Sequence, residues 1–151
     1  MEKNTYPVEE WKVTEEKFVK HWNYRNETTF ALSNGYIGTR GTFDEGYPFT
    51  VDEGLEGNFI NGFYESEHIR YGEWNFGFPE TSQSLLNLPN LKKTTIEVNG
   101  EMFDLKAGEI VEYSRSLLMN EGIVVRNVVW KSPKGKEVKA TFKRLVYLAD
   151  K

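Results

Sequence analysis

The sequence of 151 residues contains no cysteine. This absence excludes disulfides, thiolate zinc sites and cysteine nucleophiles. The two histidines, His21 and His68, lie far apart and have no partner at metal-ligand spacing, so we expect no metal site. The sequence also lacks a Gly-x-Ser-x-Gly motif, the turn that presents the nucleophile of many serine hydrolases. We therefore predict neither a metal nor an organic cofactor.

A strong excess of one charge and long apolar runs are also missing. The formal net charge is -4 and lysine and arginine form no block, so we expect no nucleic-acid partner. Residues 1–11 hold Glu2, Lys3, Glu9 and Glu10 without an apolar stretch, which is unlike a signal peptide. No run reaches the length of a transmembrane helix. These features predict a cytoplasmic protein without a membrane partner.

Asn-Gly pairs, in contrast, recur along the chain, at positions 34–35, 61–62 and 99–100. Asn-Gly tolerates the positive φ angles of type I′ turns, so it is a strong hairpin signal. We predict paired strands on both sides of the first and the third of these turns, at residues 28–32, 36–40, 94–98 and 101–105.

The C-terminal third shows the period-2 pattern of a half-buried strand. Val138, Ala140 and Phe142 alternate there with polar residues. A turn at residues 132–135 leads back to a run rich in β-branched residues at 122–130. This arrangement predicts a long antiparallel hairpin.

Helix signals are weak. Residues 81–88 are predicted to form at most one helical turn, because Pro79 and Pro89 bracket them. Residues 11–18 are predicted to form a strand.

Aromatic residues make up 15% of the chain, so the core is expected to consist mainly of large rings. The pattern predicts an all-β fold, an antiparallel β-sandwich with long loops, in a single domain over residues 1–151.

The long segment between residues 50 and 91 combines aromatic rings with carboxylates. Long loops in compact domains are usually functional or have structure of their own. Sugar-binding sites stack rings on the C–H faces of a pyranose, while carboxylates and amides accept its hydroxyl protons. Tyr71, Glu73, Trp74 and Asn75 fit that chemistry and are the candidate substrate-binding residues. The alternative is that most of the rings belong to the core.

Grouped carboxylates are a second candidate, because glycoside hydrolysis needs one protonated acid and one ionised carboxylate across the scissile bond. With 23 acidic residues in the chain, such groups also arise by chance as solvated loop charges. No catalytic residue is therefore assigned. The groups are Asp44 with Glu45, Asp52 with Glu53, and Glu65 with Glu67 and Glu73.

Gly35, Gly38 and Gly41 have the spacing of a glycine-rich loop, but strands are predicted on both sides of them. A phosphate loop needs a strand, a loop and then a helix N-terminus, so we exclude it. The glycines fit close backbone packing or a bend in a strand. We expect Val at position 38 or 41 to destabilise the fold.

The run NETTFALSNGYIGTRG at residues 26–41, with FDEG at 43–46, resembles the opening signature of glycoside hydrolase family 65. Asp44 stands there in place of the first of two acidic residues. Further segments resemble the maltose, kojibiose and trehalose phosphorylase branch of that family in the same order, at residues 59–65, 69–73, 96–101, 103–105, 113–119 and 130–135.

The resemblance implies that the chain is part of a large N-terminal sandwich of the galactose-mutarotase type, in a longer enzyme. In the family an (α/α)6 barrel follows and holds the catalytic glutamate and the phosphate pocket, so no catalytic residue carries over. The parent enzyme would use inorganic phosphate to split an α-glucoside such as maltose with inversion, giving β-glucose 1-phosphate and glucose. The chain would then serve architecture, packing against the barrel, homodimer formation and the rim of the active site.

Two other functions stay open: a free-standing carbohydrate-binding module, and a small glycosidase that uses Glu65, Glu67 and Glu73. Residues 67–68, 74–76 and 116–119 depart from the best-known phosphorylases. The identity of the disaccharide substrate is therefore not determined, and kojibiose and nigerose are among the candidates. The chain ends directly after a strand pattern. If the sandwich continues beyond it, we expect free strand edges and an uncovered apolar face.

Overall fold

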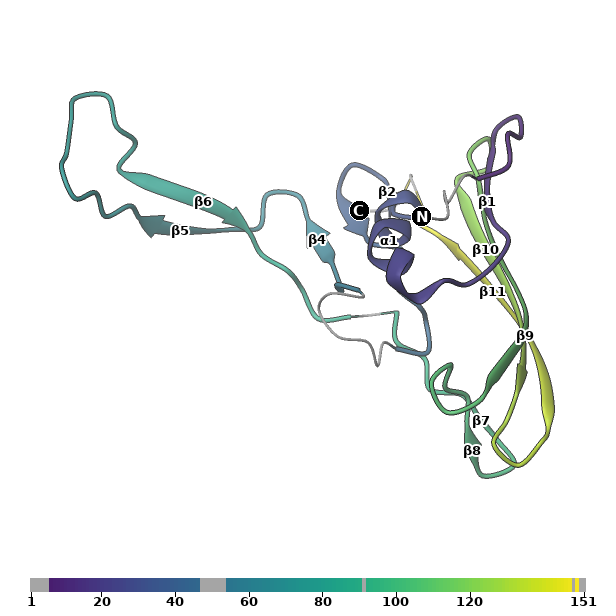
Figure 1. The fold of residues 1–151 in the computed structure, drawn as a ribbon. Coiled ribbons are helices and arrows are strands. Elements are labelled where there is room, and N and C mark those ends of the chain that lie inside the picture. The colour runs from purple at the N-terminus through teal and green to yellow at the C-terminus, as the bar shows by residue number, and fades with distance from the viewer. Residues whose placement is uncertain (1–5, 47–53, 91, 148, 150–151) are drawn as a thin grey trace.

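The computed structural model describes residues 6–46, 54–90, 92–147 and 149. Figure 1 shows a body, made of a large sheet and a second layer beside it, and a narrow arm that projects away from the body. The arm comprises residues 61–86. Within the described ranges, no helix is long and apolar enough to cross a membrane.

The main sheet is antiparallel and has the strand order β1-β9-β10-β11. Its side chains alternate between the two faces, as the pleat of a strand requires. On β10, for example, Val124, Arg126 and Val128 are buried on the face toward the second layer, whereas Asn127 is exposed on the other face. The strands are β1 (Lys12–Glu15), β9 (Glu109–Leu118), β10 (Ile123–Lys131) and β11 (Glu137–Leu145).

The second layer consists of two short helices, a small antiparallel sheet of order β2-β3-β4, and the loops between them. Large rings dominate the interior, as the composition predicts: Phe43, Phe103, Tyr113 and Trp130 belong to one buried cluster. The elements are η1 (Lys20–Trp22), α1 (Asn23–Thr29), β2 (Leu32–Ser33), β3 (Ile37–Thr39) and β4 (Asn58–Ile60).

The segment after β3 passes very close to the end of α1. Gly41 donates its backbone N–H to the carbonyl oxygen of Glu27 at 2.8 Å. A Cβ atom at this position would lie 2.9 Å from both Cβ and O of Phe30. Only glycine permits this approach, which brings the next residues over the main sheet.

The arm is a two-stranded ribbon formed by β5 (Tyr64–His68) and β6 (Thr81–Leu85). Every residue of both strands is exposed. The ribbon continues into the body, because the N–H of Leu88 donates to the carbonyl oxygen of Asn58 at 2.8 Å. A separate small hairpin, β7 (Glu97–Val98) and β8 (Glu101–Met102), lies near one end of the main sheet (Figure 1).

The structure confirms the all-β, antiparallel class and the sandwich architecture. The hairpins at both predicted Asn-Gly turns and the long hairpin β10-β11 are confirmed, although the first two have shorter strands than predicted. The long segment 50–91 carries structure of its own.

Two local predictions were wrong. Residues 28–29 lie in α1 and not in a strand, and residues 81–85 form β6 and not a helical turn. Helix α1 has no apolar stripe that the sequence could reveal, because its buried side chains are the polar Asn23, Asn26 and Glu27. Tertiary hydrogen bonds, and not hydrophobic periodicity, hold this helix in place.

Candidate functional site

The charged residues of the 26–46 signature belong to a buried ionic layer between the second layer and the main sheet. At its centre is Glu15, which is 3% exposed. Glu15 Oε1 accepts a hydrogen bond from Asn26 Nδ2 at 2.6 Å, and Oε2 accepts one from Arg115 Nε at 2.8 Å. Arg115 Nη1 donates to the carbonyl oxygen of Gly41 at 2.7 Å. The Glu15–Arg115 pair thereby joins the helix, the sheet and the signature loop.

Tyr113 completes the bonding of this carboxylate. Its hydroxyl donates to Glu15 Oε2 at 3.0 Å. Burial raises the pKa of the Tyr113 phenol; the positive charge of Arg115 opposes that rise and the negative charge of Glu15 reinforces it. The phenol therefore stays protonated and acts as a hydrogen-bond donor, so that Glu15 is surrounded by donors on both of its oxygens.

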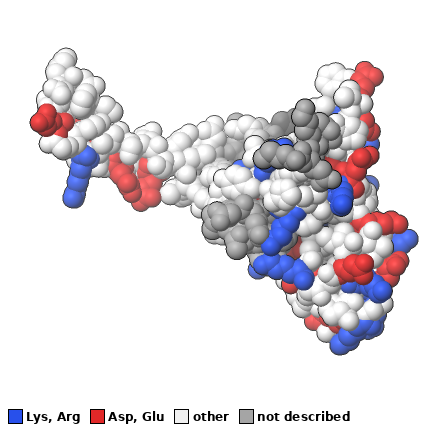
Figure 2. Space-filling model, viewed as in Figure 1, with Lys and Arg blue, Asp and Glu red and all other residues white. Residues whose placement is uncertain are grey.

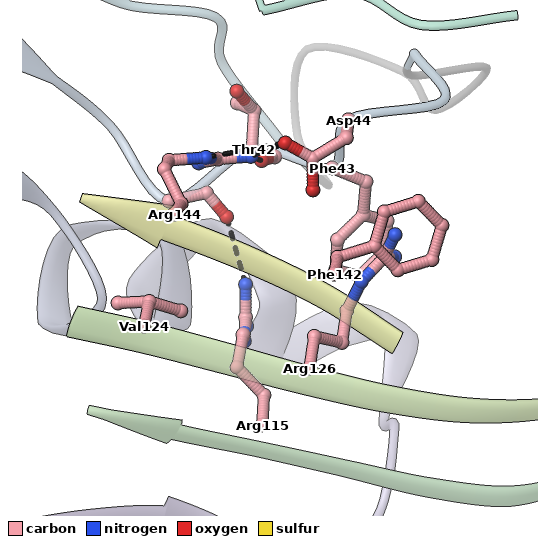
Figure 3. Close-up of a pocket in the computed structure, with 9 residues that line it drawn as sticks. Thr42, Phe43, Asp44, Arg115, Val124, Arg126, Phe142 and Arg144 are labelled. Atoms are coloured by element: carbon pink, nitrogen blue, oxygen red, sulfur yellow. Dashed lines mark hydrogen bonds and ion pairs between the residues drawn. The ribbon is translucent and has the colours of Figure 1, made fainter. Parts of the chain in front are cut away.

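Arg126, from β10, is held between two rings (Figure 3). Its guanidinium carbon lies 4.2 Å from the ring centre of Phe43 and 4.1 Å from that of Phe142. Arg126 Nη1 donates to Glu45 Oε1 at 2.8 Å, and Nη2 contacts Glu45 Oε2. A bidentate ion pair between stacked rings fixes the position of both charges.

Arg144 and Lys92 hold the loop that precedes this acid. Arg144 Nη2 donates to Asp44 Oδ1 and to the carbonyl oxygen of Thr42, both at 2.6 Å. Lys92 Nζ donates to Thr42 Oγ1 at 2.8 Å and to the carbonyl oxygen of Arg40 at 2.9 Å. Burial lowers the pKa of Lys92 to about 8, and the positive charge of Arg144 adds to that lowering.

Glu27 and Arg40 connect helix α1 to the segment that contains Leu55. Glu27 Oε2 accepts the N–H of Leu55 at 2.8 Å, and Glu27 Oε1 accepts Asn23 Nδ2 at 3.0 Å. Arg40 Nε donates to the carbonyl oxygen of Leu55 at 3.0 Å, and its Nη2 donates to the carbonyl oxygen of Tyr24 at 2.9 Å. These contacts give each charged group of the signature a structural partner.

The ionic layer leaves little room for a ligand. The space that Arg115, Arg126 and Arg144 line has a volume of about 10 Å³, which suits one water molecule and no sugar. Asp44 and Glu45 are each paired with an arginine, so neither fits the hypothesis of a catalytic acid and base. The layer is a structural brace.

The candidate sugar-binding residues Tyr71, Glu73, Trp74 and Asn75 lie together in the turn at the far end of the arm, and all four are exposed. Trp74 is 61% exposed. Tyr71 is held by its hydroxyl, which donates to the carbonyl oxygen of Pro79 at 2.9 Å. The turn therefore presents a ring, a carboxylate and an amide to the surroundings.

The remaining carboxylates of the glycosidase hypothesis lie on the same arm. Glu65 and Glu67 occupy alternate positions of β5 and share one face of the ribbon, opposite Ser84 and Ser82. They are exposed, and Glu73 is in the end turn. Asp52 and Glu53 lie outside the described residues. Over the described part of the chain, no three metal-binding side chains come together.

Sequence reasoning assigned no role to Arg126, Arg144 or Lys92. A signal was present for the two arginines. Arg126 alternates in phase with Val124 and Val128 on β10, and Arg144 follows Phe142 at the same spacing on β11. A charge at a core-facing position of an apolar strand indicates a buried ion pair. No comparable pattern marks Lys92.

The fold is a β-sandwich domain in which the acidic residues of the signature form ion pairs between the two layers. The model of the glycosyl hydrolase family 65 N-terminal domain matches residues 13–151. The chain belongs to glycosyl hydrolase family 65 and corresponds to its N-terminal domain.

The family relationship extends over most of the chain. The chain is 46% identical over 146 residues to the alpha,alpha-trehalose phosphorylase of Thermoanaerobacter brockii. The aligned residues cover 97% of this chain and 19% of that enzyme. It is 33% identical to the maltose phosphorylase of Bacillus subtilis, over 82% of this chain and 16% of the enzyme.

A solved structure of a "Putative kojibiose phosphorylase from human microbiome" has the same fold. It superposes with a TM-score of 0.83 at 26% identity, covering 95% of this chain and 19% of that one. The chain thus spans about a fifth of the length of these relatives.

Proposed function

We propose that this chain is a non-catalytic part of a disaccharide phosphorylase, in which it serves as a structural N-terminal domain. The observation that carries this proposal is the ionic layer: Asp44 and Glu45 of the signature are buried or half-buried in ion pairs with arginines of the main sheet, beside the buried Glu15–Arg115 pair. Its acids are thus engaged in structure, and the reactive groups belong to another part of the enzyme.

The proposed reaction of the whole enzyme is the inverting phosphorolysis of an α-linked glucose disaccharide, with inorganic phosphate as co-substrate. Among the named disaccharides, α,α-trehalose is favoured, because identity to a trehalose phosphorylase is 46% and identity to maltose and kojibiose phosphorylases is 33–34%. The products would be β-glucose 1-phosphate and glucose.

We assign the end turn of the arm to the rim of the active site. It carries Tyr71, Glu73, Trp74 and Asn75 on a ribbon that reaches away from the body (Figure 1). An exposed indole ring stacks on a sugar, and an adjacent carboxylate and amide bond its hydroxyl groups. The arm would bring these groups to a catalytic barrel of the same polypeptide.

The test is to assay the purified 151-residue chain with trehalose, maltose and kojibiose in phosphate buffer. We expect no glucose 1-phosphate and no glucose. Release of either product by the chain alone would sink the proposal and favour a glycosidase. Calorimetry with the same sugars distinguishes the proposal from the second alternative, a free-standing carbohydrate-binding module. Measurable binding that is abolished by Trp74→Ala would favour the module.

An assay on the whole enzyme tests which disaccharide is the substrate. If the reading frame after Lys151 encodes a helical barrel, the complete protein should release glucose 1-phosphate fastest from trehalose. Trp74→Ala in that protein should raise the KM for the sugar more than it lowers kcat, as expected for a residue that binds and does not react. An unchanged KM would remove the arm from the active site.

A further inference from the structure

The three Asn-Gly pairs of the chain share a covalent reactivity that the fold controls. In such a pair the backbone nitrogen of glycine can attack the side-chain amide carbon Cγ of asparagine, because glycine has no Cβ that obstructs the approach. The attack needs an asparagine side chain that is free to turn toward that nitrogen. The pairs at 34–35, 61–62 and 99–100 should therefore differ in reactivity as far as the structure holds them differently.

The side chain of Asn34 is held at both of its polar atoms. Its Oδ1 accepts the backbone N–H groups of Tyr36 at 2.9 Å and of Ile37 at 2.7 Å. Its Nδ2 donates to the carbonyl oxygen of Tyr147 at 2.8 Å. Moving Cγ to the Gly35 nitrogen would break these hydrogen bonds, so this pair is protected.

Asn61 is held less firmly. Its backbone N–H donates to the carbonyl oxygen of Tyr36 at 2.7 Å. Its side-chain hydrogen bonds are long: Nδ2 lies 3.4 Å from the carbonyl oxygen of Gly35, and the hydroxyl of Tyr64 lies 3.5 Å from Oδ1. Hydrogen bonds of this length are weak, so the side chain is only partly restrained.

Asn99 occupies the turn of the β7-β8 hairpin and is exposed. Among the described residues, its side chain has no hydrogen-bond partner. Its φ angle is 54°, in the left-handed region that few residues other than glycine adopt. Each strand of this hairpin has two residues, and so short a hairpin opens readily. Neither the side chain nor the backbone is fixed against the attack.

The surroundings of Gly100 leave room for the reaction. A Cβ atom at this position would meet no atom within 4 Å. The same is true of Gly35 and Gly62, so the difference between the three pairs lies in the asparagine side chains. The hairpin lies at the end of the body away from the arm, and Figure 2 shows lysine, arginine and acidic side chains over that end. Water therefore reaches the turn.

We propose that Asn99 is a site of spontaneous deamidation in the folded chain. The Gly100 nitrogen gives its proton to hydroxide and forms a bond to Cγ of Asn99. The Cγ–Nδ2 bond breaks, and Nδ2 takes a proton from water and leaves as ammonia, which restores the hydroxide. One water molecule then opens the resulting succinimide ring at either of its two carbonyl carbons, which gives aspartate or isoaspartate. The reaction involves no oxidation or reduction and does not depend on the proposed function.

The conversion should loosen the packing next to the hairpin. It adds a negative charge close in sequence to Glu101, which is buried and accepts a hydrogen bond from Ser132 Oγ at 3.0 Å. Isoaspartate also inserts a methylene group into the backbone of the turn, which disturbs the register of β7 and β8. The N–H of Phe103, a buried ring of the main cluster, donates to the carbonyl oxygen of Ile96 just outside these strands. The converted chain should therefore melt at a lower temperature.

Incubation of the purified chain in warm, mildly alkaline buffer, followed by peptide mass spectrometry, tests the site. The exchange of an amide for a carboxyl should be at least about ten-fold faster at Asn99 than at Asn34, with Asn61 between them. Incubation in guanidinium chloride is the matched control. Unfolding removes the hydrogen bonds that protect Asn34, so the three rates should converge.

Two variants assign the product to its residue. Asn99→Gln keeps an amide but closes a ring far more slowly, so the early acidic form that ion-exchange chromatography separates should disappear. Asn61→Gln should retain that form. Equal rates at the three pairs in the folded chain, or fastest conversion at Asn34, would overturn the proposal. An early acidic form that persists in Asn99→Gln would overturn it as well, because the reactive residue would then lie elsewhere.

Discussion

The body and the arm use charged residues in opposite ways. In the body, Glu15 and Arg115 are almost fully buried and are satisfied by each other and by Asn26 and Tyr113. In the arm, Glu67 lies on an exposed strand, and no ion pair to it is found among the described residues. A buried charge must have a partner, because removing it from water is costly, whereas an exposed charge needs none. The difference separates charges that are buried in the fold from charges that are exposed to solvent.

The largest expected difference between the two regions appears when one carboxylate in each is neutralised. Glu15→Gln leaves the Arg115 charge buried without its counter-charge, so it should lower the free energy of unfolding by about 3–5 kcal/mol. Glu67→Gln, the same change on the arm, should stay within about 0.5 kcal/mol of the unmodified chain. Urea titration followed by tryptophan fluorescence measures both. Equal losses would mean that the two regions do not differ as the structure indicates.

Glycine substitutions give the next effect in size. Gly41→Ala forces a Cβ to within 2.9 Å of the Phe30 backbone oxygen, so it should cost about 1–3 kcal/mol. Gly72→Ala, on the arm, meets no atom within 4 Å and should stabilise the chain by about 0.4–1 kcal/mol through the unfolded state. Thermal melting of the two variants checks the opposite signs.

The structure also separates the two glycines whose replacement by valine was expected to be harmful. At Gly38 an added Cβ would contact only the Ser33 side chain, at 3.8 Å, an ordinary distance. Gly38→Ala should therefore change the melting temperature far less than Gly41→Ala. A loss at Gly38 as large as that at Gly41 would contradict the packing described for α1 and the loop.

The last prediction is a pH dependence that arises from Lys92 in the body. The pKa of Lys92 is about 8 in the folded chain, below its ordinary value of 10.5. Between these values the unfolded chain binds the proton more strongly, so the free energy of unfolding should rise from pH 8 to about pH 10.5 and not change through this group below pH 8. Urea titrations across this range measure the slope.

Lys92→Met should remove that rise, and Lys93→Met should retain it, because Lys92 is still present. The comparison of the two variants cancels the titration of other groups. A rise of equal size in both variants would show that Lys92 is not the group responsible.

Local signals predicted part of the fold well. The Asn-Gly pairs at 34–35 and 99–100 gave two hairpins, and the alternation of Val138, Ala140 and Phe142 gave β11. Helix α1 was missed because its buried residues are polar. Strand β9 was not assigned, and its register against β10 shifts between Val129 and Trp130.

The candidate site was predicted only as a set of residue types. The sequence placed Tyr71, Glu73, Trp74 and Asn75 in one segment, and the structure puts them in one turn on an arm. Their role in sugar binding stays a prediction. The partners of Asp44 and Glu45 could not be predicted, because Arg144 and Arg126 follow them by about a hundred and by 81 residues.

The sequence by itself determined the family, the antiparallel class and the turns, because these depend on short motifs and on a period of two residues. Tertiary structure alone decided that the acids of the signature are structural, and that the arm stands clear of the body. The reason is that burial and ion pairing of a carboxylate depend on segments that are far apart in the chain. Burial and ion pairing both change the chemical properties of the carboxylate.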